Sequence, residues 1–134
     1  MKTYSSIFLL LGCVLWTHSA MAADAAPAAK ETRVLQRIRV QGTDREMGMG
    51  IALFPPNAVK PRHRAIGPEL CYVLEGEIIV LIDGVPEKIV HAGESYQLAA
   101  TDMHTTRAGP SGAKTIASWV TIPGKPFNID ATDK

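Results

Sequence analysis

Three side chains in the middle of this chain are of the types that bind divalent metal ions. His63 and Glu69 lie just ahead of an apolar segment that ends in a glycine turn, and His104 follows a second turn-rich segment. Imidazole and carboxylate groups that come together from separate strands are ligands of mononuclear metal sites. Two histidines and one carboxylate is also the ligand count of non-haem iron sites, which keep open positions for substrate and oxygen.

The segments around these residues have the pattern of short strands. Turn signals such as Asp83-Gly84 recur every ~8–12 residues, and no window shows a sustained helical period. Short strands with regular turns predict an antiparallel barrel or sandwich. The expected strands start from Arg33 and cover Met47 to Phe54, Leu70 to Leu74, Ile78 to Ile82, Pro86 to Val90, Ser95 to Leu98 and Thr115 to Ile122.

The sequence resembles the cupin superfamily, the small double-stranded β-helix barrels, over roughly Met47 to Ile122. The first cupin motif has the form His-x-His, a few residues, Glu and then a glycine, and His63, Glu69 and Gly76 match it. The resemblance implies an all-β fold: a cupin double-stranded β-helix, which is a jelly-roll-like antiparallel barrel, in a single domain.

The second cupin motif begins with a glycine and ends in a histidine, as Ala92-Gly93-Glu94 and His104 do here. Three positions depart from the family. Ala65 stands where the first motif has its second histidine, Ala99-Ala100-Thr101-Asp102 replaces the usual Pro-x-Gly, and Ala108 replaces a common asparagine. Ala65 removes one strong ligand, and on an inward face it would open space rather than supply chemistry.

The resemblance implies that His63, Glu69 and His104 hold a divalent metal ion, namely iron, manganese, zinc or nickel. The protein would then be a metal-dependent enzyme, dioxygenase-like or isomerase-like, on a small organic molecule. Glu69 has an alternative role as a catalytic base that stays off the metal. The competing hypothesis is a non-catalytic ligand-binding or sensor cupin with a metal-free pocket, which the loss of the histidine at Ala65 favours.

Two further residues have metal-binding side chains. Cys71 shares the face of Glu69 if the strand is regular, which leaves it either a soft metal ligand or a small buried hydrophobic residue. His91 precedes the Ala-Gly-Glu turn and is expected at the surface of a strand.

The basic residues around His63 are predicted to point away from it. Side chains alternate along a strand, so Lys60, Arg62 and Arg64 fall on the face opposite to His63. By the same parity, the inward neighbours of the site are expected to be mostly apolar: Thr106, Val73 and Ile79 or Val80.

The first 22 residues are predicted to be a signal peptide. Lys2 is followed by an apolar stretch from Ile7 to Trp16 and by Ala20-Met21-Ala22, a small-residue cleavage site. The apolar stretch is shorter than the ~20 residues of a membrane span. The protein is therefore expected to be periplasmic or secreted, with lipidation at Cys13 as the less favoured alternative.

The mature chain then divides into a flexible lead-in (residues 23–32), the cupin barrel (33–122) and a C-terminal tail without regular structure (123–134). Removing Lys2 from the 14 basic residues leaves 13 against 13 acidic ones, and this neutral balance argues against nucleic acid as a partner. Cys71 is then the only cysteine, so no intrachain disulfide can form. A neutral, bridge-free domain of this size is expected to form a homodimer.

Overall fold

The computed structural model describes residues 25–132, and its regular structure consists of β-strands. The predicted signal peptide and Cys13 lie outside these residues. Between residues 25 and 132 there is no helix of the length and apolarity that a membrane crossing requires. The strands are β1 (Arg33–Arg39), β2 (Glu46–Phe54), β3 (Val59–Ala65), β4 (Glu69–Ile82), β5 (Lys88–His91), β6 (Ser95–Leu98), β7 (His104–Thr121) and β8 (Asn128–Asp130).

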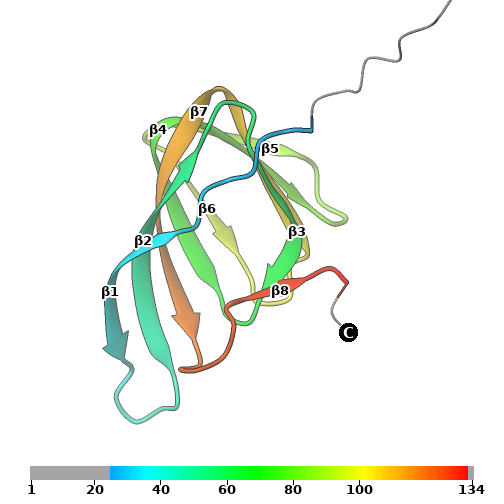
Figure 1. The fold of residues 1–134 in the computed structure, drawn as a ribbon. Helices are drawn as coiled ribbons and strands as arrows, with labels where there is room; N and C mark the ends of the chain where they lie inside the picture. Colours follow the sequence, from blue (N-terminus) through cyan, green and yellow to red (C-terminus); the bar gives the residue numbers. More distant parts are fainter. Residues whose placement is uncertain (1–24, 133–134) are drawn as a thin grey trace, which may run out of the picture.

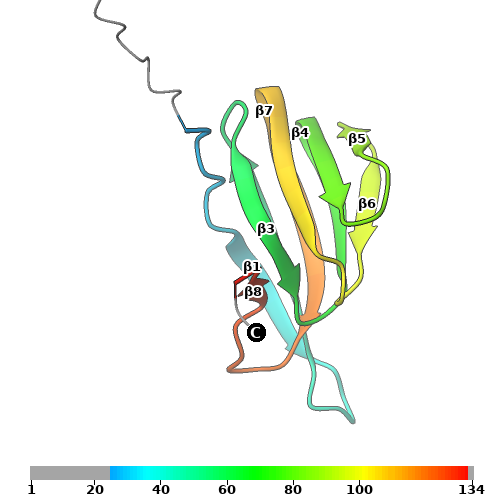
Figure 2. The same cartoon turned by 90° about the vertical axis from the view of Figure 1, so that its right-hand side faces the viewer.

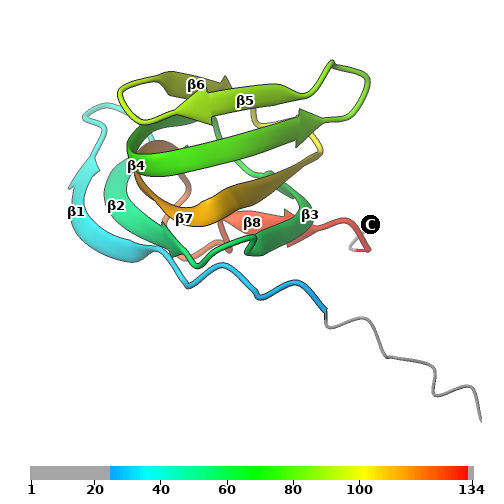
Figure 3. The same ribbon diagram turned by 90° about the horizontal axis from the view of Figure 1, so that it is seen from above.

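All strands belong to one curled antiparallel sheet in which β4 and β7 are shared by two walls (Figures 1 and 3). In the β2 wall, β1 and β2 are followed by residues 113–121 of β7, residues 69–76 of β4, and β6. In the β3 wall, β8 and β3 are followed by residues 104–108 of β7, residues 78–82 of β4, and β5. This arrangement confirms the predicted all-β antiparallel fold in a single domain.

A glycine permits the bend between the two walls. Gly76 has a φ of 72°, and a Cβ at this position would lie 2.0 Å from the carbonyl oxygen of Gly112 on the neighbouring strand. Only glycine combines a positive φ with such a close backbone approach. The same residue closes the first cupin motif, so the motif marks the corner of the barrel.

The core lies on the inner side of both walls. Val73, Ile78 and Val90 are fully buried, and Trp119 packs at one end of the core, where its ring lies 5.7 Å from that of Phe127. Among residues 25–132, five buried side chains are polar or charged, and all five come from β3 and β7: His63, His104, Thr106, Thr115 and Thr121. Buried polar side chains need partners, so their gathering on two strands indicates a site.

The C-terminal segment differs from the prediction, because part of it is structured. β8 pairs with the outer edge of β3, with Asp130 opposite His63 and Asn128 opposite Ala65, and it lies beside the end of β3 in Figures 1 and 2. The free edge of β3 offers backbone hydrogen bonds, and Phe127 gains contact with Trp119. These long-range partners are not visible in a polar, proline-rich sequence.

The predicted lead-in also contacts the sheet. Ala28 forms a parallel bridge with Val59, and the amide of Lys30 donates a hydrogen bond to the carbonyl of Leu53 over 3.0 Å. Both ends of the described chain therefore lie against the strands that carry the predicted site.

Candidate metal and ligand site

His63 and His104 form the centre of the site. β3 and β7 pair with these two residues directly opposite one another, and their ring centroids are 4.3 Å apart with an angle of 58° between the planes. Both side chains are buried, at 3% and 1% exposure. The predicted pair of imidazoles is therefore brought together from two separate strands.

The backbone fixes the orientation of both rings. His63 Nδ1 lies 2.7 Å from the carbonyl oxygen of Pro61, and His104 Nδ1 lies 2.9 Å from that of Asp102. A carbonyl oxygen can only accept, so each Nδ1 carries the proton and donates it. Each Nε2 is then left as a lone-pair donor for a metal ion, which is the arrangement typical of metal-binding histidines.

Burial keeps the two imidazoles neutral. It lowers the pKa of His63 to about 4 and also lowers the pKa of His104. The positive charge of Lys60 adds to the lowering at both rings, while the negative charge of Glu69 partly offsets it at His104. Neutral imidazole is the form that binds metal ions, so the pair is ready to bind at pH 7.

Glu69 and Cys71 face the same cavity from β4. The Cys71 thiol donates a hydrogen bond to Glu69 Oε1 over 3.4 Å. Burial, reinforced by the charge of Glu69, raises the pKa of Cys71 well above its usual value, so the sulfur stays protonated. A buried neutral thiol is a poor ligand and nucleophile, which favours the interpretation of Cys71 as a small buried residue.

A cavity of about 430 Å³ lies between the walls and contains all three predicted ligands. Its volume falls near the lower end of the range for small-molecule sites, about 300–1,000 Å³. Besides His63, Glu69 and His104, its lining includes Cys71, Tyr96, Thr106, Thr115, Trp119 and Thr121 from the barrel, and Phe127 and Asp130 from the tail.

The donor chemistry suits a divalent ion, although the three ligands are not gathered at ligand distance. Over residues 25–132, no group of three or more His, Cys, Asp or Glu side chains is arranged to hold a metal ion. Two oriented, neutral imidazoles and one carboxylate nevertheless line one cavity. Binding would require the Glu69 carboxylate to close toward the histidine pair.

Ala65 does not open space in the cavity as expected. It is 1% exposed, it pairs with Asn128 of β8, and it is not among the residues that line the cavity. At the position where the family has its second histidine, this chain has a buried alanine on the strand edge that pairs with β8.

The position of Lys60 differs from the one predicted from strand alternation. Lys60 pairs with Thr106, and His63 pairs with His104, so β3 contains one more residue than β7 between these two pairs. Such a bulge shifts the alternation by one residue, and Lys60 lines the cavity together with His63. Pro61 was the available signal, because proline within a strand is typical of bulges and edges.

The other surface predictions are confirmed. Arg62 and Arg64 do not line the cavity, and Arg62 forms an exposed ion pair with Asp83. His91 is exposed on β5, where its Nδ1 lies 3.3 Å from a carboxylate oxygen of Glu77. The tail residues of the cavity were missed, since nothing local in the sequence places them there.

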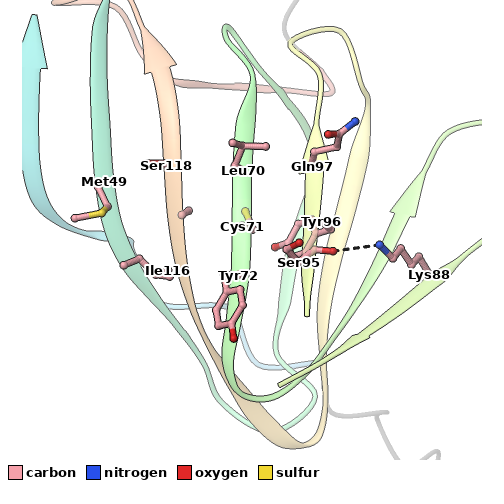
Figure 4. A pocket seen from close by; sticks show the side chains of 11 residues that line it. Met49, Leu70, Cys71, Tyr72, Lys88, Ser95, Tyr96, Gln97, Ile116 and Ser118 are labelled. Carbon is pink, nitrogen blue, oxygen red and sulfur yellow. Dashed lines mark hydrogen bonds between the residues drawn. The ribbon is translucent and has the colours of Figure 1, made fainter. Parts of the chain in front are cut away.

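A second hollow, the outer groove, lies on the outer side of the β2 wall. Figure 4 shows Met49, Ile116, Leu70 and Tyr72 side by side on β2, β7 and β4, with the Lys88 amine 3.2 Å from the Ser95 carbonyl oxygen at one end. The hollow has a volume of about 610 Å³. Exposed apolar side chains grouped in this way mark interaction surfaces more often than scattered ones do.

The sequence pattern of the cupin domain family matches residues 50–121 of this chain. The chain belongs to the cupin family. The match spans both histidines, Glu69 and the glycine corner, and it confirms the resemblance found in the sequence.

Two curated cupins are similar in sequence. The dimethylsulfoniopropionate lyase DddW of Ruegeria pomeroyi is 41% identical over 81 residues, which cover 58% of this chain and 53% of the lyase. The cupin-domain-containing oxidoreductase virC of Hypocrea virens is 30% identical over 81 residues, which cover 60% of this chain and 42% of that protein. The chain thus spans about half the length of the curated relatives it matches.

A solved structure agrees on the fold. The dimethylsulfoniopropionate (DMSP) lyase DddQ of Ruegeria pomeroyi superimposes with a TM-score of 0.59 at 17% identity, over 66% of this chain and 44% of the lyase. At this identity the likeness establishes the cupin architecture alone.

Proposed function

We propose that this protein is a metal-binding cupin that acts on a small organic molecule in the cavity between its two walls. The observation that carries the proposal is the histidine pair. His63 and His104 are buried, neutral and oriented by backbone carbonyls, so that both Nε2 atoms are free for a common ligand. Inert buried histidines normally satisfy both ring nitrogens within the fold.

His63 and His104 would supply nitrogen ligands and Glu69 an oxygen ligand to iron, manganese, zinc or nickel. When bound, such an ion polarises a substrate oxygen or activates dioxygen. The barrel buries both rings, and the backbone carbonyls of Pro61 and Asp102 hold the rings in place. In the alternative arrangement Glu69 stays off the metal and serves as the general base, because its carboxylate lines the same cavity.

The sequence relatives favour turnover of a small molecule over a purely structural role. One is named a dimethylsulfoniopropionate lyase and the other an oxidoreductase, and each is similar to more than half of this chain. The cavity volume suits a substrate of that size.

Metal content of the mature protein, purified without chelators and without a histidine tag, tests this proposal. We expect near-stoichiometric metal in the wild-type protein and its loss in His63→Ala and His104→Ala. His91→Ala is the matched control, because His91 is exposed and outside the cavity. Absence of metal after anaerobic loading with iron, manganese, zinc and nickel would contradict the proposal that the protein is a metalloenzyme.

A second candidate function is a metal-free cupin that binds its ligand without turnover. Ala65 favours it, since the family's fourth ligand position is filled by a buried alanine, which cannot bind a metal ion. A wild-type protein that stays metal-free but binds small molecules in the cavity would establish this alternative.

We further infer that the protein is exported as a periplasmic or secreted domain. The support is the charged, apolar and small-residue pattern of residues 1–22. Intact-mass analysis of the mature protein should give an N-terminus at Ala23. A lipidated N-terminus at Cys13 would show an anchored lipoprotein instead.

We also infer a homodimer in which a second copy covers the outer groove. Leu70 is 62% exposed and Tyr72 45% exposed on that face, and the neutral mature chain sets up no net repulsion between copies. Sizing at several concentrations should show a dimer that Leu70→Glu shifts to monomer. Leu81→Glu, on the opposite half of β4 and 38% exposed, is the control that should leave the dimer intact.

A further inference from the structure

Lys60 brings a positive charge into the cavity beside the two histidines. The bulge after it turns its side chain to the face of His63, and Lys60 is half-buried rather than solvated. Lys60 pairs with Thr106 of β7, and both residues line the cavity together with the histidine pair. The lysine side chain therefore lies on the face of the proposed site.

Within residues 25–132, no carboxylate lies within ion-pair distance of Lys60. Four other basic residues do have such partners, and the nearest along the chain is Arg62, which pairs with Asp83 outside the cavity. Lys60 also makes no side-chain hydrogen bond to the described residues. A partly desolvated ammonium without a protein anion is suited to an anionic ligand.

The Thr121 side chain is a second, independent indication that the cavity binds a ligand. It is 3% exposed, it lines the same cavity, and its hydroxyl oxygen has no hydrogen-bond partner. An unsatisfied buried hydroxyl costs about 1–3 kcal/mol. A ligand with a polar group at this position would remove that cost.

We propose that the cavity recognises a small organic carboxylate, whose carboxylate group is bound by the Lys60 ammonium and whose second polar group hydrogen-bonds the Thr121 hydroxyl. The inference deepens the proposed function, because it names the substrate class of the same cavity. It requires no metal ion at the Lys60 end.

The charge of the cavity favours a carboxylate over a phosphate. Phosphate sites usually combine several donors, such as an arginine fork or a run of backbone amides. Next to the histidine pair the cavity lining has one lysine, Lys60, and two carboxylates, Glu69 and Asp130. These carboxylates repel a dianion more strongly than a monoanion. One ammonium matches the single charge of a carboxylate.

The test uses 3-hydroxypropionate as the probe, with 3-hydroxypropionamide as its uncharged analogue and inorganic phosphate as a competing anion. Calorimetric titrations are run on metal-free and on zinc-loaded full-length mature protein. We expect the carboxylate to bind and the amide to bind roughly ten- to a hundredfold more weakly, from the loss of one charge-assisted contact.

Lys60→Met should weaken carboxylate binding by the same factor while leaving amide binding unchanged. Arg62→Met is the matched control, because it removes a charge from the outer side of the same bulge. Thr121→Val should weaken binding by a smaller factor and leave the melting temperature of the ligand-free protein equal or higher, since it removes the unsatisfied hydroxyl. Circular dichroism confirms that each variant is folded.

Equal binding of acid and amide, unchanged binding in folded Lys60→Met, or no binding of the acid to folded wild-type protein would each overturn the inference. Tighter binding of inorganic phosphate would overturn the choice of a carboxylate. Lys60-dependent binding in a protein that never takes up metal would support the inference while the metalloenzyme proposal fails, so the two outcomes remain distinguishable.

Discussion

The inner and outer faces of the same strands have opposite character. On β4, Glu69 and Cys71 face the cavity, whereas the alternating neighbours Leu70 and Tyr72 are exposed on the outer groove. The inner face also carries the buried histidines and threonines of β3 and β7. Most small domains place apolar groups inside and polar groups outside. The reversal at this end of the barrel fits the proposed ligand binding on the inner face and the proposed association on the outer face.

The largest effect should follow from crowding the inner face at Gly48. A Cβ at this position would lie 2.4 Å from the Trp119 ring, which is buried and also packs against Phe127. Gly48→Ala should therefore lower the free energy of unfolding by about 3 kcal/mol, at the upper end of the usual cost of overpacking.

Urea denaturation followed by Trp119 fluorescence measures this loss. Met47→Ala, at the next position on β2 but 45% exposed, should change the free energy of unfolding by less than about 0.5 kcal/mol. Equal losses in the two variants would show that the two faces do not differ in packing.

The second-largest expected effect is a loss of folding stability at low pH, caused by the buried histidines of the inner face. The pKa of His63 is about 4 in the folded state against a usual value near 6.5, and that of His104 is also lowered. A lowered histidine pKa means that the unfolded chain binds protons more readily, so stability present above pH ~6.5 is lost as the pH falls toward ~4. The metal-free protein should lose about 2 kcal/mol over this range.

Unfolding midpoints at several pH values test this expectation. His63→Gln should make the unfolding midpoint less dependent on pH. His91→Ala, which removes an exposed histidine, should leave the pH dependence unchanged. A dependence that persists fully in His63→Gln would show that other groups cause the acid sensitivity.

A smaller effect is expected at the tail. Phe127→Ala removes the ring that packs on Trp119, and the half-buried position should limit the loss to about 1 kcal/mol. The variant should also red-shift Trp119 fluorescence, because water gains access to the indole ring. Ile89→Ala, on an outward position that is 49% exposed, should do neither.

The smallest effect is expected at Arg62, whose ion pair with Asp83 is exposed. Arg62→Ala should leave the unfolding midpoint unchanged within error, because water and salt screen such pairs. A clear drop in the midpoint would show that the outer side of the bulge contributes to the barrel.

Much of the fold and the histidine pair could be predicted from local sequence. Most strands follow from apolar residues and regular turn signals, and the two motifs predicted that His63 and His104 would meet. The strand β3 and the first half of β7, which carry these histidines, are polar and were not among the predicted strands. The predicted features depend on spacing within single segments, which a sequence displays directly.

Other parts of the site depend on contacts between distant segments. Lys60 was placed on the wrong face because one extra residue at the bulge reverses the alternation, and only Pro61 hinted at it. β8 forms because the edge of β3 and the ring of Trp119 are available to it, and neither is near in sequence.

The sharing of β7 by both walls has a consequence for the order in which the protein folds. β7 pairs with β2, β3 and β4, so neither wall can close until residues 104–121 are available. A chain still being synthesised can form the β1–β2 and β4–β5 hairpins but no closed barrel. Folding then depends on pairings between distant segments, which are slow to find, and we expect milliseconds to seconds for the released chain.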